Sequence, residues 1–115
     1  MAGIVFFGTQ QIDEIERFYT TLVGMEVWLK QEDCVILKHE NILVGFCKRS
    51  RIDLSGIITF FYRTKEEVDA MYDRLEDIAQ ALPEKNEKYN IYRFFAHDPE
   101  QRVLEFQHFL HPVDI

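Results

Sequence analysis

The sequence predicts an α+β fold in which one β-α-β-β-β unit occurs twice in tandem. Three observations lead to this prediction: short apolar runs typical of strands, two stretches with apolar residues at helical spacing, and the same order of both in each half of the 115 residues. The two modules cover residues 1–50 and 56–115 and share a polar linker at 49–55. We expect them to form a curved mixed sheet that lines a cleft, with the helices outside.

The first unit begins with a short buried strand at residues 3–8. A helix follows, with Thr9 as its expected N-cap and apolar residues from Ile12 to Leu22 on one side. Gly24 stands where a glycine commonly ends a helix. The next apolar runs predict three strands, at 25–30, 34–39 and 42–48, with a tight turn at Glu40-Asn41 between the last two.

The second unit repeats this order. A strand at 57–63 leads to Thr64, which with Glu67 forms a capping box at the start of a second helix. Pro83 marks the end of the helical region. The remaining strands are expected at 85–89, 91–96 and 103–110.

Composition narrows the classes of function. The chain has 20 acidic and 13 basic residues, a net charge of −7, which fits nucleic acid and anionic membranes poorly. It is compatible with a neutral or cationic small molecule. No secretory signal pattern opens the chain, and no apolar run is long enough to cross a bilayer. With only two cysteines, the chain is expected in the cytoplasm.

Three stretches resemble the vicinal oxygen chelate superfamily, which includes glyoxalases, bleomycin-resistance proteins and extradiol dioxygenases. They are the helix end Ile15-Glu16-Arg17-Phe18-Tyr19 with Leu22-Val23-Gly24-Met25, the second helix Val68-Asp69-Ala70-Met71-Tyr72-Asp73-Arg74-Leu75, and the closing Asp98-Pro99-Glu100-Gln101-Arg102-Val103-Leu104-Glu105. Together they span nearly the whole chain. The resemblance implies a small-molecule protein that forms a homodimer. It also implies a turn in which Gln101 replaces the usual glycine.

The resemblance also implies where a metal would bind. The four metal-binding positions of the family correspond here to Ile4, Val44, Ile57 and Glu105. Three of these are aliphatic and cannot coordinate an ion, and one carboxylate does not supply the several converging donors that a divalent ion needs. We therefore expect no metal centre of the usual type and no cofactor.

Glu105 is a carboxylate in an otherwise apolar strand, which is costly unless something uses it. It is the candidate general base or polar anchor for a ligand. Alternatively, a neighbour such as Arg63 or Tyr92, or water, satisfies it. Strand alternation predicts an inner face around it that also includes Ile4, Val44, Ile57 and Val103, and the candidate ligand-binding residues are Phe6, Trp28, Phe46, Thr59, Phe61, Arg63, Tyr92, Phe94 and Gln107.

The two cysteines have a specific geometry. If Glu40-Asn41 is a two-residue hairpin loop, Cys34 and Cys47 face each other across the hairpin, close enough for a disulfide. The expected cytoplasmic location favours two packed thiols instead.

Three functions follow from these patterns. The first is a binding protein for a neutral or cationic small molecule, of the bleomycin-resistance type and without the usual metal ligands. The second is a metal-independent isomerase or lyase in which Glu105 moves a proton. The third is a non-catalytic interaction module whose cleft is filled by its own aromatic side chains.

Overall fold

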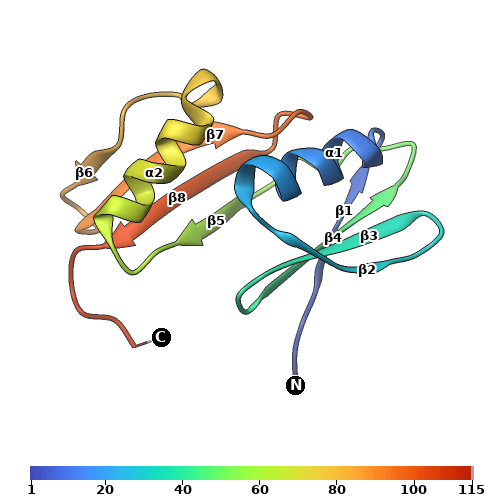
Figure 1. Cartoon of the computed structure of the whole chain (residues 1–115), viewed down its shortest axis with the longest axis horizontal. Helices are drawn as coiled ribbons and strands as arrows, with labels where there is room; N and C mark the ends of the chain where they lie inside the picture. The colour runs from blue at the N-terminus through green and yellow to red at the C-terminus, as the bar shows by residue number, and fades with distance from the viewer. Residues whose placement is uncertain (115) are drawn as a thin grey trace. The chain divides into compact units, whose positions relative to one another are not determined.

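The structure, a computed structural model, describes residues 1–114 and consists of two compact units. Unit 1 is Met1–Ser55 together with Asp98–Gln101, and unit 2 is Gly56–His97 together with the chain from Arg102 onward. Each unit holds a four-stranded sheet and a helix, so the predicted α+β class and the tandem repeat are confirmed (Figure 1). Within the described residues no helix is long and apolar enough to span a bilayer.

Unit 1 has the predicted order of elements. In its sheet, called sheet A, the strands lie in the order β1-β4-β3-β2. The first strand runs parallel to β4, and the other neighbours are antiparallel. The elements are β1 (Val5–Thr9), α1 (Ile12–Phe18), a π-helical turn η1 (Tyr19–Val23), β2 (Glu26–Lys30), β3 (Cys34–His39) and β4 (Ile42–Lys48).

The ends of α1 differ partly from the prediction. Gln11, not Thr9, is the N-cap residue. The hydroxyl of Thr9 instead accepts a hydrogen bond of 3.2 Å from the Gln11 backbone and donates one to the Glu100 carboxylate. At the other end Gly24 adopts φ 92°, and its N–H bonds to the Tyr19 carbonyl at 3.0 Å. This left-handed residue is the predicted helix stop.

Unit 2 is built in the same way around sheet B, whose strands lie in the order β5-β8-β7-β6. The predicted helix start is confirmed, because Thr64 Oγ1 accepts a hydrogen bond from the Glu67 N–H at 3.2 Å. The turn before the last strand places Gln101 at φ 74°, the left-handed conformation that usually selects glycine. The elements are β5 (Ile57–Phe61), α2 (Lys65–Leu75), a 3₁₀ turn η2 (Glu76–Ile78), β6 (Glu84–Asn86), β7 (Ile91–His97) and β8 (Val103–Phe109).

Each helix packs on one face of its own sheet, and aromatic rings fill the contact. In unit 1 the Phe46 ring stacks on Tyr19 with the centroids 5.0 Å apart. In unit 2 Phe94 stacks on Phe106 at 5.1 Å and meets Tyr72 of α2 edge to face at 5.5 Å. We call the opposite side of each sheet its helix-free face.

The predicted inner face is therefore wrong at four positions. Phe46 and Phe94 are helix-packed and almost fully buried. Val44 lies on the same face of β4 as Phe46. Tyr92 also points to the helix side, where its hydroxyl donates to Asp69 of α2.

The register also corrects the alignment of the two units. Phe6 pairs with Gly45 in the parallel ladder of sheet A, and Thr59 pairs with Glu105 in that of sheet B. The alignment of Ile4 with Ile57 also places Phe6 opposite Thr59. The ladder partner of Phe6, Gly45, therefore corresponds to the ladder partner of Thr59, Glu105. The predicted counterpart, Val44, is one residue off. Glycine has no side chain to coordinate an ion, so the corrected position is no better as a metal ligand.

Candidate functional site

Glu105 lies at the centre of a polar cluster on the helix-free face of sheet B. Its side chain comes from the middle of β8, and the residue is only 8 % exposed. Thr59 Oγ1 donates a hydrogen bond of 2.9 Å to Oε1, and the Arg93 guanidinium donates one of 3.1 Å to Oε2. Both carboxylate oxygens therefore have partners within unit 2, from the two strands that flank β8.

The Arg93 side chain is held from a second direction. Its guanidinium carbon lies 4.8 Å from the centroid of the Phe95 ring, a cation–π distance. Phe95 is the direct partner of Glu105 in the β7–β8 ladder, so ring and carboxylate are neighbours on one face. The sequence suggested Arg63 or Tyr92 as the partner of Glu105, but the carboxylate is bonded to Thr59 and Arg93 instead. The pairing follows instead from the diagonal placement of Arg93 on β7.

The other predicted ligand residues are divided among different surfaces. Gln107 lies two residues after Glu105 on β8, so both side chains point to the helix-free face of sheet B. Phe61 pairs with Gln107 in the β5–β8 ladder and therefore lies on the same face. Trp28 lies on β2 at the edge of sheet A and is half exposed. Arg63 follows the end of β5.

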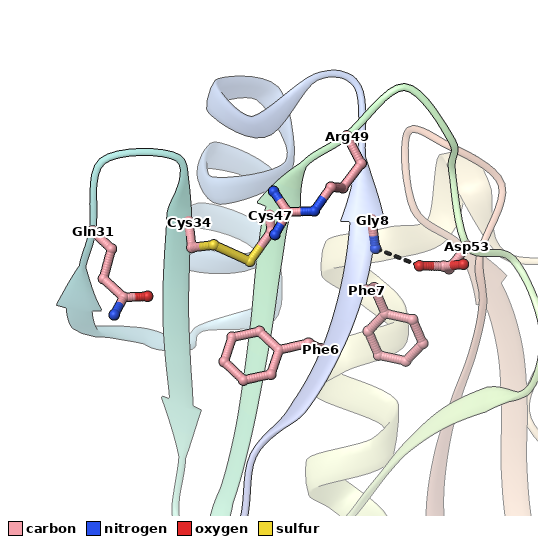
Figure 2. A pocket seen from close by; sticks show the side chains of 8 residues that line it. All are labelled: Phe6, Phe7, Gly8, Gln31, Cys34, Cys47, Arg49 and Asp53. Carbon is pink, nitrogen blue, oxygen red and sulfur yellow. Dashed lines mark hydrogen bonds between the residues drawn. A yellow bond between two sulfur atoms is a disulfide. The ribbon is translucent and has the colours of Figure 1, made fainter.

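A pocket of about 370 Å³ opens on unit 1. Figure 2 shows it beside β1, β3 and β4, on the side of sheet A away from α1. Of the residues predicted to bind a ligand, only Phe6 lines it. The lining residues are Phe6, Phe7, Gly8, Gln31, Cys34, Cys47, Arg49 and Asp53.

A disulfide between Cys34 and Cys47 forms part of the pocket wall. The two residues are direct partners in the β3–β4 ladder, as the two-residue hairpin predicts. The expectation of two packed thiols is wrong, because the hairpin brings the two Cα atoms to 4.0 Å and the sulfurs are bonded. The facing positions of the two cysteines were predicted correctly, whereas their reduced state was not.

Two glycines let aromatic and loop atoms approach the sheet closely. A Cβ on Gly45 would lie 2.4 Å from the Phe6 ring, so this ring lies directly over the glycine. A Cβ on Gly8 would lie 2.5 Å from the Arg51 carbonyl. The segment after β4 can therefore pack against β1, where Asp53 Oδ2 accepts a hydrogen bond of 2.6 Å from the Gly8 N–H (Figure 2).

The charges at the pocket nearly cancel. Arg49 and Asp53 are its two charged lining residues, one of each sign. The guanidinium of Arg49 also pairs with Asp33 at 3.1 Å, and that pair is more than half exposed. The pocket thus combines aromatic rings with an amide and with charged groups of both signs.

Two further hollows in unit 1, each about 360 Å³, are lined mostly by charged and polar side chains. One lies along the start of α1 and the other beside the β3–β4 turn. Neither is lined by Phe, Tyr or Trp, so of these three hollows the pocket beside Phe6 suits a small molecule best.

No group of three or more His, Cys, Asp or Glu side chains that could hold a metal occurs among residues 1–114. Of the positions that the resemblance implies for a metal, with the corrected register, Ile4, Gly45 and Ile57 offer no ligand atom in a side chain, and Glu105 is engaged by Thr59 and Arg93. The donor set therefore does not fit a divalent ion of the usual type.

The Tyr92 hydroxyl has a raised pKa. Burial, followed by the hydrogen bond to Asp69 and the charge of that carboxylate, raises the pKa of its hydroxyl to about 12. The ring also carries Lys65 Nζ above it, 4.6 Å from its centroid. Tyr92 therefore acts as a neutral donor that joins β7 to α2.

Sequence reasoning missed most of the pocket. Gln31 precedes β3 at a turn, and Arg49 and Asp53 lie in the stretch interpreted as a linker. One signal was available: the facing cysteines mark the end of the hairpin, where these segments meet. No sequence pattern marks Gly8, because its role depends on how closely the Arg51 carbonyl approaches β1, and the sequence does not show the path of that loop.

No protein-family model and no curated protein sequence matches the chain. Solved structures do match. A glyoxalase/bleomycin resistance protein/dioxygenase from Alicyclobacillus acidocaldarius is 18 % identical with a TM-score of 0.80, covering 96 % of this chain and 92 % of that one. A family enzyme of the same description from Burkholderia phytofirmans PsJN is 18 % identical with a TM-score of 0.81, covering 93 % and 97 %.

A third match is a lactoylglutathione lyase from Agrobacterium tumefaciens, 21 % identical with a TM-score of 0.77, covering 94 % of this chain and 92 % of that one. These structures agree with the resemblance found in the three sequence stretches. The chain therefore has the fold of the glyoxalase/bleomycin resistance protein/dioxygenase group.

Proposed function

We propose that this chain is a small-molecule binding protein that takes a planar ligand, neutral or cationic, in the pocket of unit 1. The observation that carries the proposal is the pocket itself: about 370 Å³, an aromatic ring on one side and a few polar groups around it. The net charge of −7 disfavours anions at long range, and the compensated Arg49 and Asp53 give the pocket no strong preference of its own.

Planar dyes of different charge test this proposal. We expect thioflavin T (cationic) and Nile red (neutral) to bind with one-to-one stoichiometry and 8-anilinonaphthalene-1-sulfonate (anionic) to bind more weakly. Phe6→Ala should weaken binding of the first two about fivefold, because it removes an aromatic contact worth roughly 1 kcal/mol. Tyr89→Ala is the control, since Tyr89 is a similarly exposed aromatic residue in unit 2. Equal effects of the two substitutions would contradict a site at the pocket.

A catalytic role for Glu105 is the second candidate, favoured by its central place on the helix-free face of sheet B. Its burial and the engagement of both oxygens support a structural anchor over a free general base. Glu105→Gln separates the two roles. A binding protein keeps its dye affinity in this variant, whereas an isomerase or lyase loses turnover.

The third candidate, a module whose cleft is filled by its own rings, loses much of its support. Phe46 and Phe94 fill the helix-packed cores and not the helix-free faces. Homodimer formation stays a prediction from the resemblance, and sedimentation velocity on the purified chain tests it.

A further inference from the structure

We propose that the Cys34–Cys47 disulfide is a thiol-exchange site for small aliphatic thiols, which reach it through the pocket of unit 1. This chemistry is independent of reversible ligand binding, although it uses the same opening. Three features of the structure support it: the position of the disulfide in the pocket wall, the cover on the other side of the strands, and the uneven charge around the two sulfurs.

The pocket is the approach to the sulfurs. Both cysteines line it, although the residues are only 9 % and 6 % exposed. On the other face of the same strands, Val35 and Phe46 are buried against the helix side. A nucleophile therefore meets the disulfide from the pocket or only after the hairpin has opened.

The carboxylate beside Cys34 makes Cys47 the better leaving group. Asp33 Oδ1 lies 3.5 Å from Cys34 Sγ, and its other oxygen pairs with Arg49. Figure 2 shows the Arg49 side chain running back toward Cys47. Negative charge that develops on a departing sulfur is disfavoured beside the carboxylate and favoured beside the guanidinium. Attack on Cys34, with Cys47 as the leaving group, follows.

The exchange balances without any further oxidant. A thiolate attacks Cys34 Sγ, a new S–S bond forms, the Cys34–Cys47 bond breaks, and Cys47 leaves as a thiolate that takes a proton from solvent. A second thiol molecule attacks the mixed disulfide. A bond forms between the two small-thiol sulfurs, the bond to Cys34 breaks, and Cys34 is released as a thiol together with the disulfide of the small thiol. The freed Cys34 thiol then has an acceptor ready in Asp33 Oδ1.

The probe is 2-mercaptoethanol, with the full-length oxidised chain. Opening is followed by mass spectrometry after trapping with iodoacetamide, and peptide mapping locates the first adduct. Gln31→Trp narrows the pocket at an exposed lining position, and Glu32→Trp is the matched control, since Glu32 is exposed, adjacent and does not line the pocket. The same rates are measured in low concentrations of urea.

We expect the adduct on Cys34, a rate about tenfold lower in Gln31→Trp, no more than a twofold change in Glu32→Trp, and no dependence on urea well below the unfolding transition. Three results would each overturn the proposal. They are an adduct on Cys47, equal slowing in both variants, and a rate that rises with urea in parallel with unfolding. The last result would place the reaction in the unfolded chain, which needs no pocket.

Discussion

The hydroxyl of Tyr19 donates a hydrogen bond of 2.7 Å to Oδ2 of Asp98, a residue 79 positions further along the chain. Both residues are at most 2 % exposed. Asp98 opens the turn between β7 and β8, and its other oxygen accepts the Glu100 N–H at 2.8 Å. The aspartate of the closing motif thus has two tasks within unit 1: it fixes the turn and it pairs with a buried phenol.

Tyr19→Phe should lower the free energy of unfolding by roughly 1–3 kcal/mol. The substitution keeps the ring stack with Phe46 and removes only the donor, so a buried carboxylate loses a partner. Urea unfolding followed by far-ultraviolet circular dichroism measures the change. Tyr89→Phe serves as the control, because Tyr89 is exposed, and a similar loss in that variant would contradict the explanation.

The ion pair of Glu105 gives a second prediction. Arg93→Gln should cost about 2 kcal/mol of stability, because a nearly buried carboxylate is left without its charged partner. Lys85→Gln breaks the exposed pair with Glu87 and should change stability by less than about 0.5 kcal/mol. The two variants are compared by their midpoints of urea unfolding, with the dependence of the unfolding free energy on urea concentration held the same. If both changes are equally small, Glu105 is solvated and the cluster is not a structural anchor.

Alkaline pH should weaken unit 2 through Tyr92. Its pKa is raised from 10.0 to about 12, so the folded chain holds this proton more tightly than the unfolded chain does. The contribution to stability is fully present below pH 10 and is lost as the pH rises through about 12. Tyr92→Phe removes this part of the pH dependence. Unfolding free energies of both proteins, measured across that interval, should converge as the pH rises; parallel curves would contradict the assignment.

The order of the elements could be predicted from the sequence because each apolar run has one clear period. Strand faces could be predicted only where the two sides of a strand differ. In β8, Leu104 and Phe106 alternate with Glu105, so the polar side was correctly assigned to the helix-free face. In β4 and β7 both sides are apolar or aromatic, as with Phe94 and Phe95, and alternation alone cannot say which side the helix covers.

The cysteines show a different limit. Hairpin geometry predicts that Cys34 and Cys47 face each other, but oxidation depends on the surroundings of the chain and not on its register. The expected cytoplasmic location stays a prediction. The disulfide removes the argument from cysteine usage that supported it, since such bonds persist mainly in oxidising compartments.

Gly8→Ala should disturb both the stability of unit 1 and the pocket. The added Cβ would lie 2.5 Å from the Arg51 carbonyl, a backbone atom that can move away only if the segment after β4 shifts. We expect a loss of about 2 kcal/mol from this overpacking. The shift also displaces Asp53 from the Gly8 N–H, so thioflavin T affinity should fall.

Gly3→Ala is the matched control for Gly8→Ala, because a Cβ at Gly3 meets nothing within 4 Å. It should leave both the unfolding free energy and dye binding unchanged. The two readouts also separate two explanations. If Gly8→Ala lowers stability but leaves thioflavin T affinity intact, the loop packs as described and the dye binds elsewhere. If neither quantity changes, the close approach of the Arg51 carbonyl to β1 is wrong, and the wall of the pocket formed by Arg49 and Asp53 is wrong with it.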